Sequence, residues 1–310
     1  MMRKTLLWLS GQQQVFRFVR SNPLARRFAS RFVAGESVES AVDAVRPLNA
    51  RGISASLDLL GESVTRAEEA ARARDEYLRM LDRIHQMEVD ANVSVKLTQM
   101  GLDISNQLCL ENMTLILDRA RQYGTFVRLD MEGSAYTERT LDFFANRLYD
   151  RYAGVTGVVI QSCLRRSAAD VDRLIEMGAR VRLCKGAYLE PPEVAFSDKA
   201  EVDRNYLTLM ERLLENGNYP GLATHDEKML DHARAFARGK GLSSDRFEFQ
   251  MLYGVRRDLQ LRLRHEGYRM RVYIPFGTQW YPYLMRRLPE PPANIAFILG
   301  GVFREALSRR

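Results

Sequence analysis

Residues 157–184 read GVVIQSCLRRSAADVDRLIEMGARVRLC. The stretch begins with the short apolar run Gly157–Gln161 and ends with a second one, Arg180–Cys184. Between them, Ala168–Met177 has the spacing of an amphipathic helix and stops at Gly178, a residue that typically follows a helix C-terminus. Two parallel strands need a crossover between them, so a strand, a helix and a strand in this order predict a βαβ unit.

The same alternation of short apolar runs and longer helical stretches continues along most of the chain. Eight parallel strands in 310 residues favour closure into a (β/α)8 TIM-type barrel. The alternative is an open doubly wound sheet, but neither its GxGxxG fingerprint nor a Walker A loop occurs. The eight runs are Ile53–Leu57, Val93–Leu97, Phe126–Asp130, Gly157–Gln161, Arg180–Cys184, Gly221–Thr224, Phe247–Met251 and Arg271–Pro275.

Two of the intervening helices carry terminal signals. The stretch Thr65–Glu88 begins with a Thr-x-x-Glu pattern, which predicts a capping box between Thr65 and Glu68. The stretch Asp226–Ala237 is followed by Gly239, which predicts the end of that helix.

The beginning of the chain is basic. Residues 1–34 contain seven lysines and arginines and no acidic residue. Such a start fits a mitochondrial presequence, a weak secretory core or a surface helix with basic neighbours. We expect the last of these: a helical arm, residues 1–50, retained in a bacterial cytosolic protein. The (β/α)8 barrel domain would then occupy residues 51–310.

Composition excludes several classes of protein. Hydrophobic residues make up 46% and charged residues 27%, an ordinary globular balance, and no run approaches the length of a transmembrane helix. Cys109, Cys163 and Cys184 are widely spaced, which argues against a disulfide framework or a zinc site and for a reducing compartment. The net charge of +7 fits anionic membranes or ligands, whereas no nucleic-acid-binding motif occurs. We predict no metal and no nucleic acid.

Polar residues gather where the predicted strands end, which is where (β/α)8 barrels carry their reactive groups. Each has an alternative structural interpretation: Asp or Thr can cap the next helix, and His225 fits a hydrogen-bonded core histidine. Two of the six lysines at strand ends are harder to explain structurally, because lysine prefers solvent. The residues at these positions are Lys96, Asp130, Gln161, Arg182, Lys185, Thr224, His225, Gln250 and Tyr273.

The segment after the last predicted strand contains a pair of arginines. On a helix, Tyr283 lies beside Arg286 and Arg287, and Arg286 can pair with Glu290. Adjacent arginines fit a solvated helix face. The alternative is an anion clamp, because planar guanidinium groups suit a carboxylate or a phosphate. From the residues alone, the sequence predicts an anion-binding barrel enzyme.

Six stretches resemble, in the same order, those of the proline dehydrogenases, and the small monofunctional bacterial members in particular. No room remains for the aldehyde dehydrogenase domain of the bifunctional relatives, and the stretch between Tyr273 and the arginine pair is shorter than theirs. The six are VSVKL at 93–97, LDME at 129–132, VRLCKGAY at 181–188, ATH at 223–225, FEFQML at 247–252 and the segment 273–287.

The resemblance implies a reaction, a cofactor and partners. FAD would lie across the carboxyl-terminal mouth of the barrel. L-Proline would be oxidised to Δ1-pyrroline-5-carboxylate, the first step of proline catabolism, by hydride transfer to flavin N5. The electrons would pass to a quinone, and the basic arm would touch anionic lipid at the inner face of the cytoplasmic membrane.

The resemblance also implies roles for individual residues. Asp130, bracing the substrate-binding arginines, and Arg182, favouring the reduced flavin, would be catalytic. Lys96, Arg286 and Arg287 would bind the proline carboxylate, and Leu252, Tyr273 and Tyr283 would enclose its ring. FAD would be bound by Met131, Gln161, Arg182, Lys185, Gly186, Ala187, Tyr188, Thr224, His225, Gln250 and Glu290.

Two other functions remain open at this point. A Schiff-base aldolase would use Lys96 or Lys185 as its nucleophile. A non-catalytic barrel protein would hold an anion at its mouth without turning it over.

Overall fold

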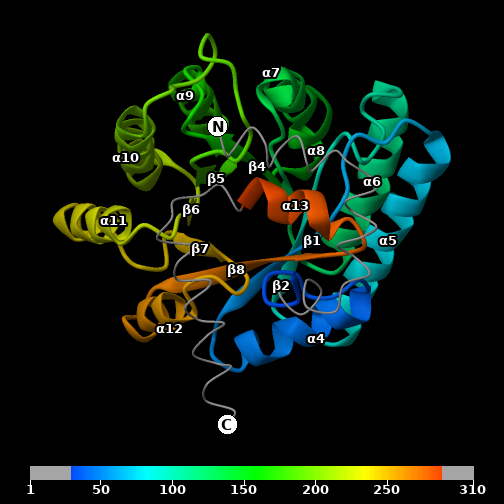
Figure 1. The fold of residues 1–310 in the computed structure, drawn as a ribbon, viewed down its shortest axis with the longest axis horizontal. Coiled ribbons are helices and arrows are strands. Elements are labelled where there is room, and N and C mark those ends of the chain that lie inside the picture. Colours follow the sequence, from blue (N-terminus) through cyan, green and yellow to red (C-terminus); the bar gives the residue numbers. More distant parts are fainter. Residues whose placement is uncertain (1–28, 288–310) are drawn as a thin grey trace.

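The computed structural model describes residues 29–287 of the chain. They form a closed barrel of eight parallel strands surrounded by helices (Figure 1). Each strand pairs with the next along the chain, and the last pairs with the first from Ser54 opposite Arg271 to Leu59 opposite Phe276. This last pairing closes the sheet and confirms the predicted (β/α)8 barrel.

All eight predicted runs form strands. The run Arg180–Cys184 coincides with its strand to the residue, whereas β2 ends at Val95, because Lys96 and Leu97 already accept the hydrogen bonds of a following turn. The strands are β1 Ser54–Leu59, β2 Ala91–Val95, β3 Val127–Leu129, β4 Thr156–Gln161, β5 Arg180–Cys184, β6 Gly221–Ala223, β7 Glu248–Leu252 and β8 Arg269–Phe276.

A helix follows each of the first seven strands and packs outside the barrel (Figure 1). After β3 the helix passes through a π-helical stretch before its last turn. The bounds are α5 Ala67–Gln86, α6 Asn106–Gln122, α7 Ser134–Phe143 with η1 Phe144–Tyr149 and α8 Asp150–Tyr152, α9 Ser167–Glu176, α10 Lys199–Asn216, α11 Glu227–Gly239 and α12 Arg257–His265.

One of the predicted helix ends is confirmed and two are wrong. Helix α9 ends before Gly178, as expected. The predicted capping box at Thr65 is wrong. The N-cap residue of α5 is Arg66, which has an extended backbone, so Thr65 lies one residue before the cap position. No side chain caps this helix. The predicted stop at Gly239 is also wrong, since α11 includes that residue and the left-handed glycine is Gly241.

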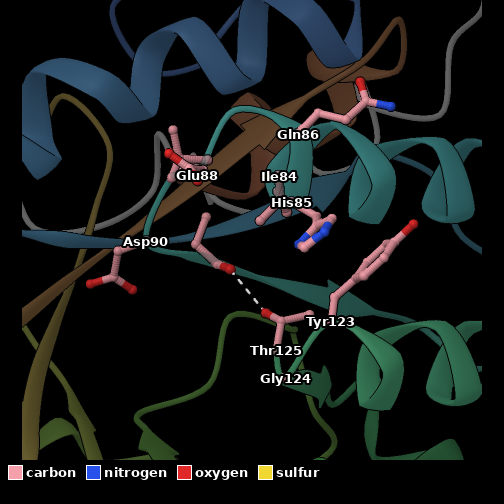
Figure 2. Close-up of a pocket in the computed structure, with 10 residues that line it drawn as sticks. Ile84, His85, Gln86, Glu88, Asp90, Tyr123, Gly124 and Thr125 are labelled. Atoms are coloured by element: carbon pink, nitrogen blue, oxygen red, sulfur yellow. Dashed lines mark hydrogen bonds between the residues drawn. The ribbon is translucent and has the colours of Figure 1, made fainter.

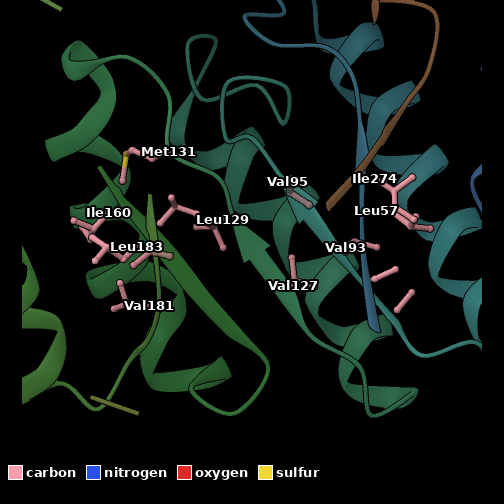
Figure 3. Close-up of a cluster of buried hydrophobic side chains, with 14 of the residues drawn as sticks. Leu57, Val93, Val95, Val127, Leu129, Met131, Ile160, Val181, Leu183 and Ile274 are labelled. Carbon is pink, nitrogen blue, oxygen red and sulfur yellow. The ribbon is translucent and has the colours of Figure 1, made fainter. Parts of the chain in front are cut away.

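The two faces of the strands differ in chemistry. Because side chains alternate along a strand, Leu57 points outward into the apolar layer between strands and helices, whereas Ser56 and Asp58 point into the barrel. Figure 3 shows this apolar layer, with Val93, Leu129, Ile160, Val181 and Ile274 among its side chains. The side chains that point into the barrel are therefore polar, and those that point outward form the hydrophobic core between the strands and the helices.

Helix α4, Val38–Asn49, belongs to the outer layer of helices. Its side chains Val38, Ala41, Val42 and Val45 are buried in the same core as the barrel strands. Residues 29–50 of the expected arm thus pack on the barrel, and residues 1–28 lie outside the described part of the chain.

Helix α13, Trp280–Arg287, follows β8 but lies across the barrel opening in Figure 1. Its Tyr283 and Leu284 pack in a small separate cluster with Leu60, which follows β1, and with Phe32. The helix after the last strand is thereby placed at the carboxyl-terminal mouth.

Two further expectations concern membranes and cysteines. Within residues 29–287, none of the helices combines the length and the apolarity that crossing a bilayer requires. None of the three cysteines is joined in a disulfide; Cys109 is buried, and Cys163 and Cys184 are half-buried.

Candidate active site

Arg182 on β5 lies at the centre of a polar network inside the barrel, where the residue is 5% exposed. Its Nη1 donates to Oδ1 of Asp130 at 2.7 Å, and its Nε donates to Oε1 of Gln250 at 2.5 Å. Its Nη2 donates to the hydroxyls of Ser56 and Ser94 at 3.3 and 3.2 Å. Because these partners lie on or directly after four other strands, the guanidinium group is held from several sides.

Tyr273 on β8 completes the surroundings of this ion pair. Its hydroxyl donates to Oδ2 of Asp130 at 2.7 Å, and the Arg182 guanidinium lies 5.2 Å from the centre of its ring. Both oxygens of Asp130 are therefore engaged. Burial, and secondarily the Asp130 carboxylate, raise the pKa of Tyr273 well above its usual value, so this hydroxyl remains a donor.

Lys96 forms a second buried ion pair nearby. Its Nζ lies 2.9 Å from Oδ1 of Asp58, and both side chains are almost inaccessible to solvent. Burial alone would lower the pKa of Lys96, but the carboxylates of Asp58 and Asp130 outweigh it and raise that pKa. The amine stays protonated, which opposes its use as a Schiff-base nucleophile.

The loop after β5 approaches the end of β4 closely at Gly186. This glycine has φ of +107°, and a Cβ at its position would lie 2.4 Å from Sγ of Cys163 and 3.1 Å from Oε1 of Gln161. A side chain would be excluded both by this crowding and by the backbone conformation. The loop thus presents bare backbone next to Gln161, whose Nε2 donates to the Glu132 carbonyl at 2.9 Å.

Lys185, Thr224 and His225 lie on the neighbouring loops. Nζ of Lys185 is 2.8 Å from Asp203 and 3.4 Å from Asp226. The Thr224 hydroxyl accepts the backbone N–H of Asp226 at 3.1 Å in a turn. The residue that caps α11 is Asp226, not Thr224.

His225 connects the ends of β6 and β7. Its Nε2 accepts the backbone N–H of Leu252 at 2.9 Å, so a neutral ring carries its proton on Nδ1. Leu252 itself is half-buried at the end of its strand.

Two contacts join the loop after β5 to other loops at the mouth. The Tyr188 hydroxyl donates to Oε2 of Glu62, after β1, at 3.3 Å. The backbone N–H of Ser134, after β3, donates to Glu190 at 2.9 Å. Ala187, next to Tyr188, is half-buried on the same loop.

A cavity of about 590 Å³ lies away from this network, where the chain enters β2 and β3 (Figure 2). His85 and Tyr123 stack there with ring centres 4.1 Å apart, and the Thr125 hydroxyl donates to the Ala91 carbonyl at 3.1 Å. These residues lie at the amino-terminal ends of the strands. None of the predicted site residues lines this cavity.

Comparison with known proteins identifies the family. Residues 41–299 match the model of the family described as proline dehydrogenase. The chain belongs to the proline dehydrogenase family. It is 41% identical to the proline dehydrogenase of Deinococcus radiodurans over 305 residues, which cover 97% of this chain and 98% of the relative. It is 42% identical to proline dehydrogenase 2 of Bacillus subtilis over 289 residues, 92% of this chain and 95% of the relative.

The fold is also similar to a solved structure. Proline utilization A (PutA) of Bdellovibrio bacteriovorus, inactivated by N-propargylglycine, matches with a TM-score of 0.80 at 26% identity. The match covers 92% of this chain and 38% of that longer one.

The structure places most of the residues that the proline dehydrogenase pattern singled out at one end of the barrel. Asp130, Arg182, Tyr273 and Gln250 are joined by hydrogen bonds. Among the described residues, Asp130 pairs with Arg182; the side chains of the arginines that it is expected to brace lie outside them. Met131 is different, because its side chain is buried in the apolar layer outside the strands (Figure 3).

The residues at and after α13 are described less completely. Tyr283 is buried against Leu60. Arg286 and Arg287 end the helix at the mouth, but their side chains lie outside what the structure describes, and so does all of Glu290.

Sequence reasoning missed two buried carboxylates. Asp58 pairs with Lys96, and Glu248 accepts hydrogen bonds from Gln250 and Arg271. The alternation of side chains along a strand could have identified both. Asp58 follows the run Ile53–Leu57 directly, and Glu248 lies two residues before Gln250, on the same strand face.

Proposed function

We propose that this chain binds FAD and oxidises L-proline to Δ1-pyrroline-5-carboxylate. Membership of the proline dehydrogenase family supports the reaction. In this chain, the proposal is supported by the hydrogen-bonded group of Arg182, Asp130 and Tyr273, which lies beside the buried Lys96. These cationic and polar side chains lie at the mouth where a barrel enzyme binds its substrate.

The residues present fit a flavin nucleotide. Nη1 of Arg182 carries two hydrogens, and within residues 29–287 only Asp130 accepts one, so a donor remains for a ligand. The bare backbone at Gly186 allows close approach, and Lys185 adds a positive charge on the same loop. Gln161, Arg182, Lys185, Gly186 and His225 would hold the cofactor, with Ala187, Tyr188, Thr224 and Glu290 also assigned to it. Met131, whose side chain lies in the apolar layer, would contribute only its backbone. Bound FAD would supply the two-electron acceptor.

The protein's own groups would bind and orient proline. Lys96, Arg286 and Arg287 would hold the carboxylate, which places the ring carbon next to nitrogen for loss of hydride. Leu252, Tyr273 and Tyr283 would enclose the ring and exclude water. The substrate nitrogen must be unprotonated when hydride leaves, because an iminium develops there. The fixed charge of Arg182 would favour the electron-rich reduced cofactor.

The first expected result is that the purified protein is yellow. The absorption spectrum should show non-covalent FAD, and anaerobic addition of proline should bleach it. A protein that stays colourless and cannot be reconstituted with FAD would contradict the proposal. Trapping by borohydride with a substrate in place of bleaching would indicate the aldolase alternative, which the protonated Lys96 opposes.

We further propose that a membrane quinone reoxidises the flavin and that the basic start of the chain touches anionic lipid. Ala29, Phe32 and Val33 are buried against α13, so the part assigned to lipid is residues 1–28, with six lysines and arginines and no acidic residue. Anionic surfaces attract such segments.

Exchanging Arg17, Arg20, Arg26 and Arg27 for glutamine should weaken binding to anionic lipid vesicles and lower turnover with membrane quinone. Activity with a soluble dye should not change. Binding of the unaltered protein should fall with rising salt, because surface attraction is screened within about 10 Å at 0.1 M salt. The matched control exchanges four exposed barrel arginines, Arg72, Arg204, Arg238 and Arg246. Equal vesicle binding by both variants would refute the membrane role.

A further inference from the structure

Glu248 begins β7 inside the barrel, one layer below Gln250, and is 4% exposed. Three donors converge on its carboxylate. Gln250 Nε2 and Arg271 Nε bind Oε1 at 2.5 and 2.8 Å, and the Tyr219 hydroxyl binds Oε2 at 3.1 Å. Burial pushes the pKa of Glu248 upward, but the Arg271 guanidinium and the hydrogen bonds outweigh it, so the pKa lies below its usual value. The group is a buried carboxylate.

Gln250 bridges this carboxylate and Arg182. A glutamine amide has one end that donates and one that accepts. Glu248 can only accept and Arg182 can only donate, so the Gln250 NH₂ group faces Glu248 and its oxygen faces Arg182. The reverse orientation would set two acceptors against each other and two donors against each other. Glu248 and Arg182 therefore fix the amide between them, with the Gln250 oxygen held on Arg182.

The sheet leaves space for this bridge. Gly221 on β6 lies between β5 and β7, and a Cβ there would come within 2.4 Å of Gln250 Nε2. The side chain of Gln250 thus occupies the space over Gly221 on its way from β7 to Arg182 on β5. Any larger residue at Gly221 would displace it.

We propose that Glu248 is a positioning residue that acts through Gln250 to hold Arg182 in its orientation toward the flavin. The inference rests on the proposed function, because it concerns the arginine assigned there to the reduced cofactor. In the relay, Glu248 orients Gln250, Gln250 binds Arg182 Nε, and Asp130 binds Arg182 Nη1. None of the steps requires Glu248 to touch a ligand.

The test uses FAD-loaded Glu248→Gln. This variant replaces the charged acceptor of the Gln250 NH₂ group by a neutral amide, so the contact that anchors Gln250 against Arg182 is weakened. Flavin reduction by proline, followed anaerobically by stopped flow, should slow about tenfold or more, as the loss of a hydrogen bond to a charged group implies. The midpoint potential of the bound flavin should become more negative, while the proline Kd changes less than about threefold. Glu215→Gln, at an exposed residue paired with Lys240, should change none of these values.

A double-mutant cycle separates this relay from a purely structural role. If Glu248 acts through Gln250, Gln250→Leu alone should slow reduction similarly, and adding Glu248→Gln should slow it no further. If Glu248 only neutralises Arg271, Glu248→Gln should lower the Tm without changing the flavin potential, and that result would overturn the proposal.

If Glu248→Gln does not fold, Gln250→Leu provides the test by itself. This variant preserves the ion pair of Glu248 with Arg271. A normal potential and a normal reduction rate in Gln250→Leu would also overturn the proposal. Failure of the proposed function looks different, because in that case the unaltered protein itself would not be bleached by proline.

Discussion

Arg182→Met is expected to slow reduction of the bound flavin by proline at least about a hundredfold, the usual effect of removing a fixed donor that stabilises developing negative charge. Methionine fills similar space but leaves neither a positive charge nor an N–H. The midpoint potential should fall, whereas the Kd of proline should change little, because other residues are assigned to the carboxylate. Stopped-flow reduction and spectroelectrochemistry measure the two effects separately.

The same substitution should also lower stability. Asp130 would retain only the Tyr273 hydroxyl among its described partners, and breaking a buried ion pair typically costs about 3–5 kcal/mol. Thermal unfolding of the FAD-loaded protein measures this loss. The matched control is Arg180→Met, two residues earlier on the same strand, where the guanidinium packs on Phe126 and Tyr219. A normal potential and rate in Arg182→Met would remove this residue from the proposed mechanism.

Arg286→Ala and Arg287→Ala are each expected to lower kcat/KM for proline about ten- to a hundredfold. Each change removes a charge-assisted hydrogen bond to the carboxylate worth about 1.5–3 kcal/mol, and about 1.4 kcal/mol corresponds to a factor of ten. Lysine at either position should restore only part of the activity, because an ammonium group cannot form a planar bidentate contact. The FAD content should stay normal.

Prolinamide provides the specific readout for this clamp. It lacks the carboxylate, so the preference of the enzyme for proline over prolinamide should shrink in both alanine variants. Arg257→Ala, at the exposed first residue of α12, is the control and should have little effect. Full kcat/KM for proline in both Arg286→Ala and Arg287→Ala would place the pair on a solvated surface and would remove the basis for the proposed substrate contacts.

Local pattern was sufficient to predict the strands. The run Arg180–Cys184 was located to the residue because a short apolar stretch begins soon after Gly178, and that glycine adopts the left-handed conformation that ends α9. The capping box at Thr65 failed because a capping motif states only a preference. The backbone of Arg66 makes the turn instead, one residue later.

The resemblance assigned residues to the proposed site but did not indicate which of them contact one another. It assigned Lys96, Arg182 and Gln250 to ligands without indicating which carboxylates would neutralise or orient them. It implies no role for Asp58, which lies near a strand end, or for Glu248, which shares a strand face with Gln250.

Apolar periodicity and family motifs are local properties, and they were enough to predict the barrel and to assign residues to its mouth. The contact of Arg182 with Asp130, 52 residues away, and the reach of Gln250 over Gly221 to the same arginine exist only in the folded barrel. They arise from closure of the sheet. Contacts across the interior depend on the register of all eight strands and on the pairing of β8 with β1, which no short stretch of sequence encodes.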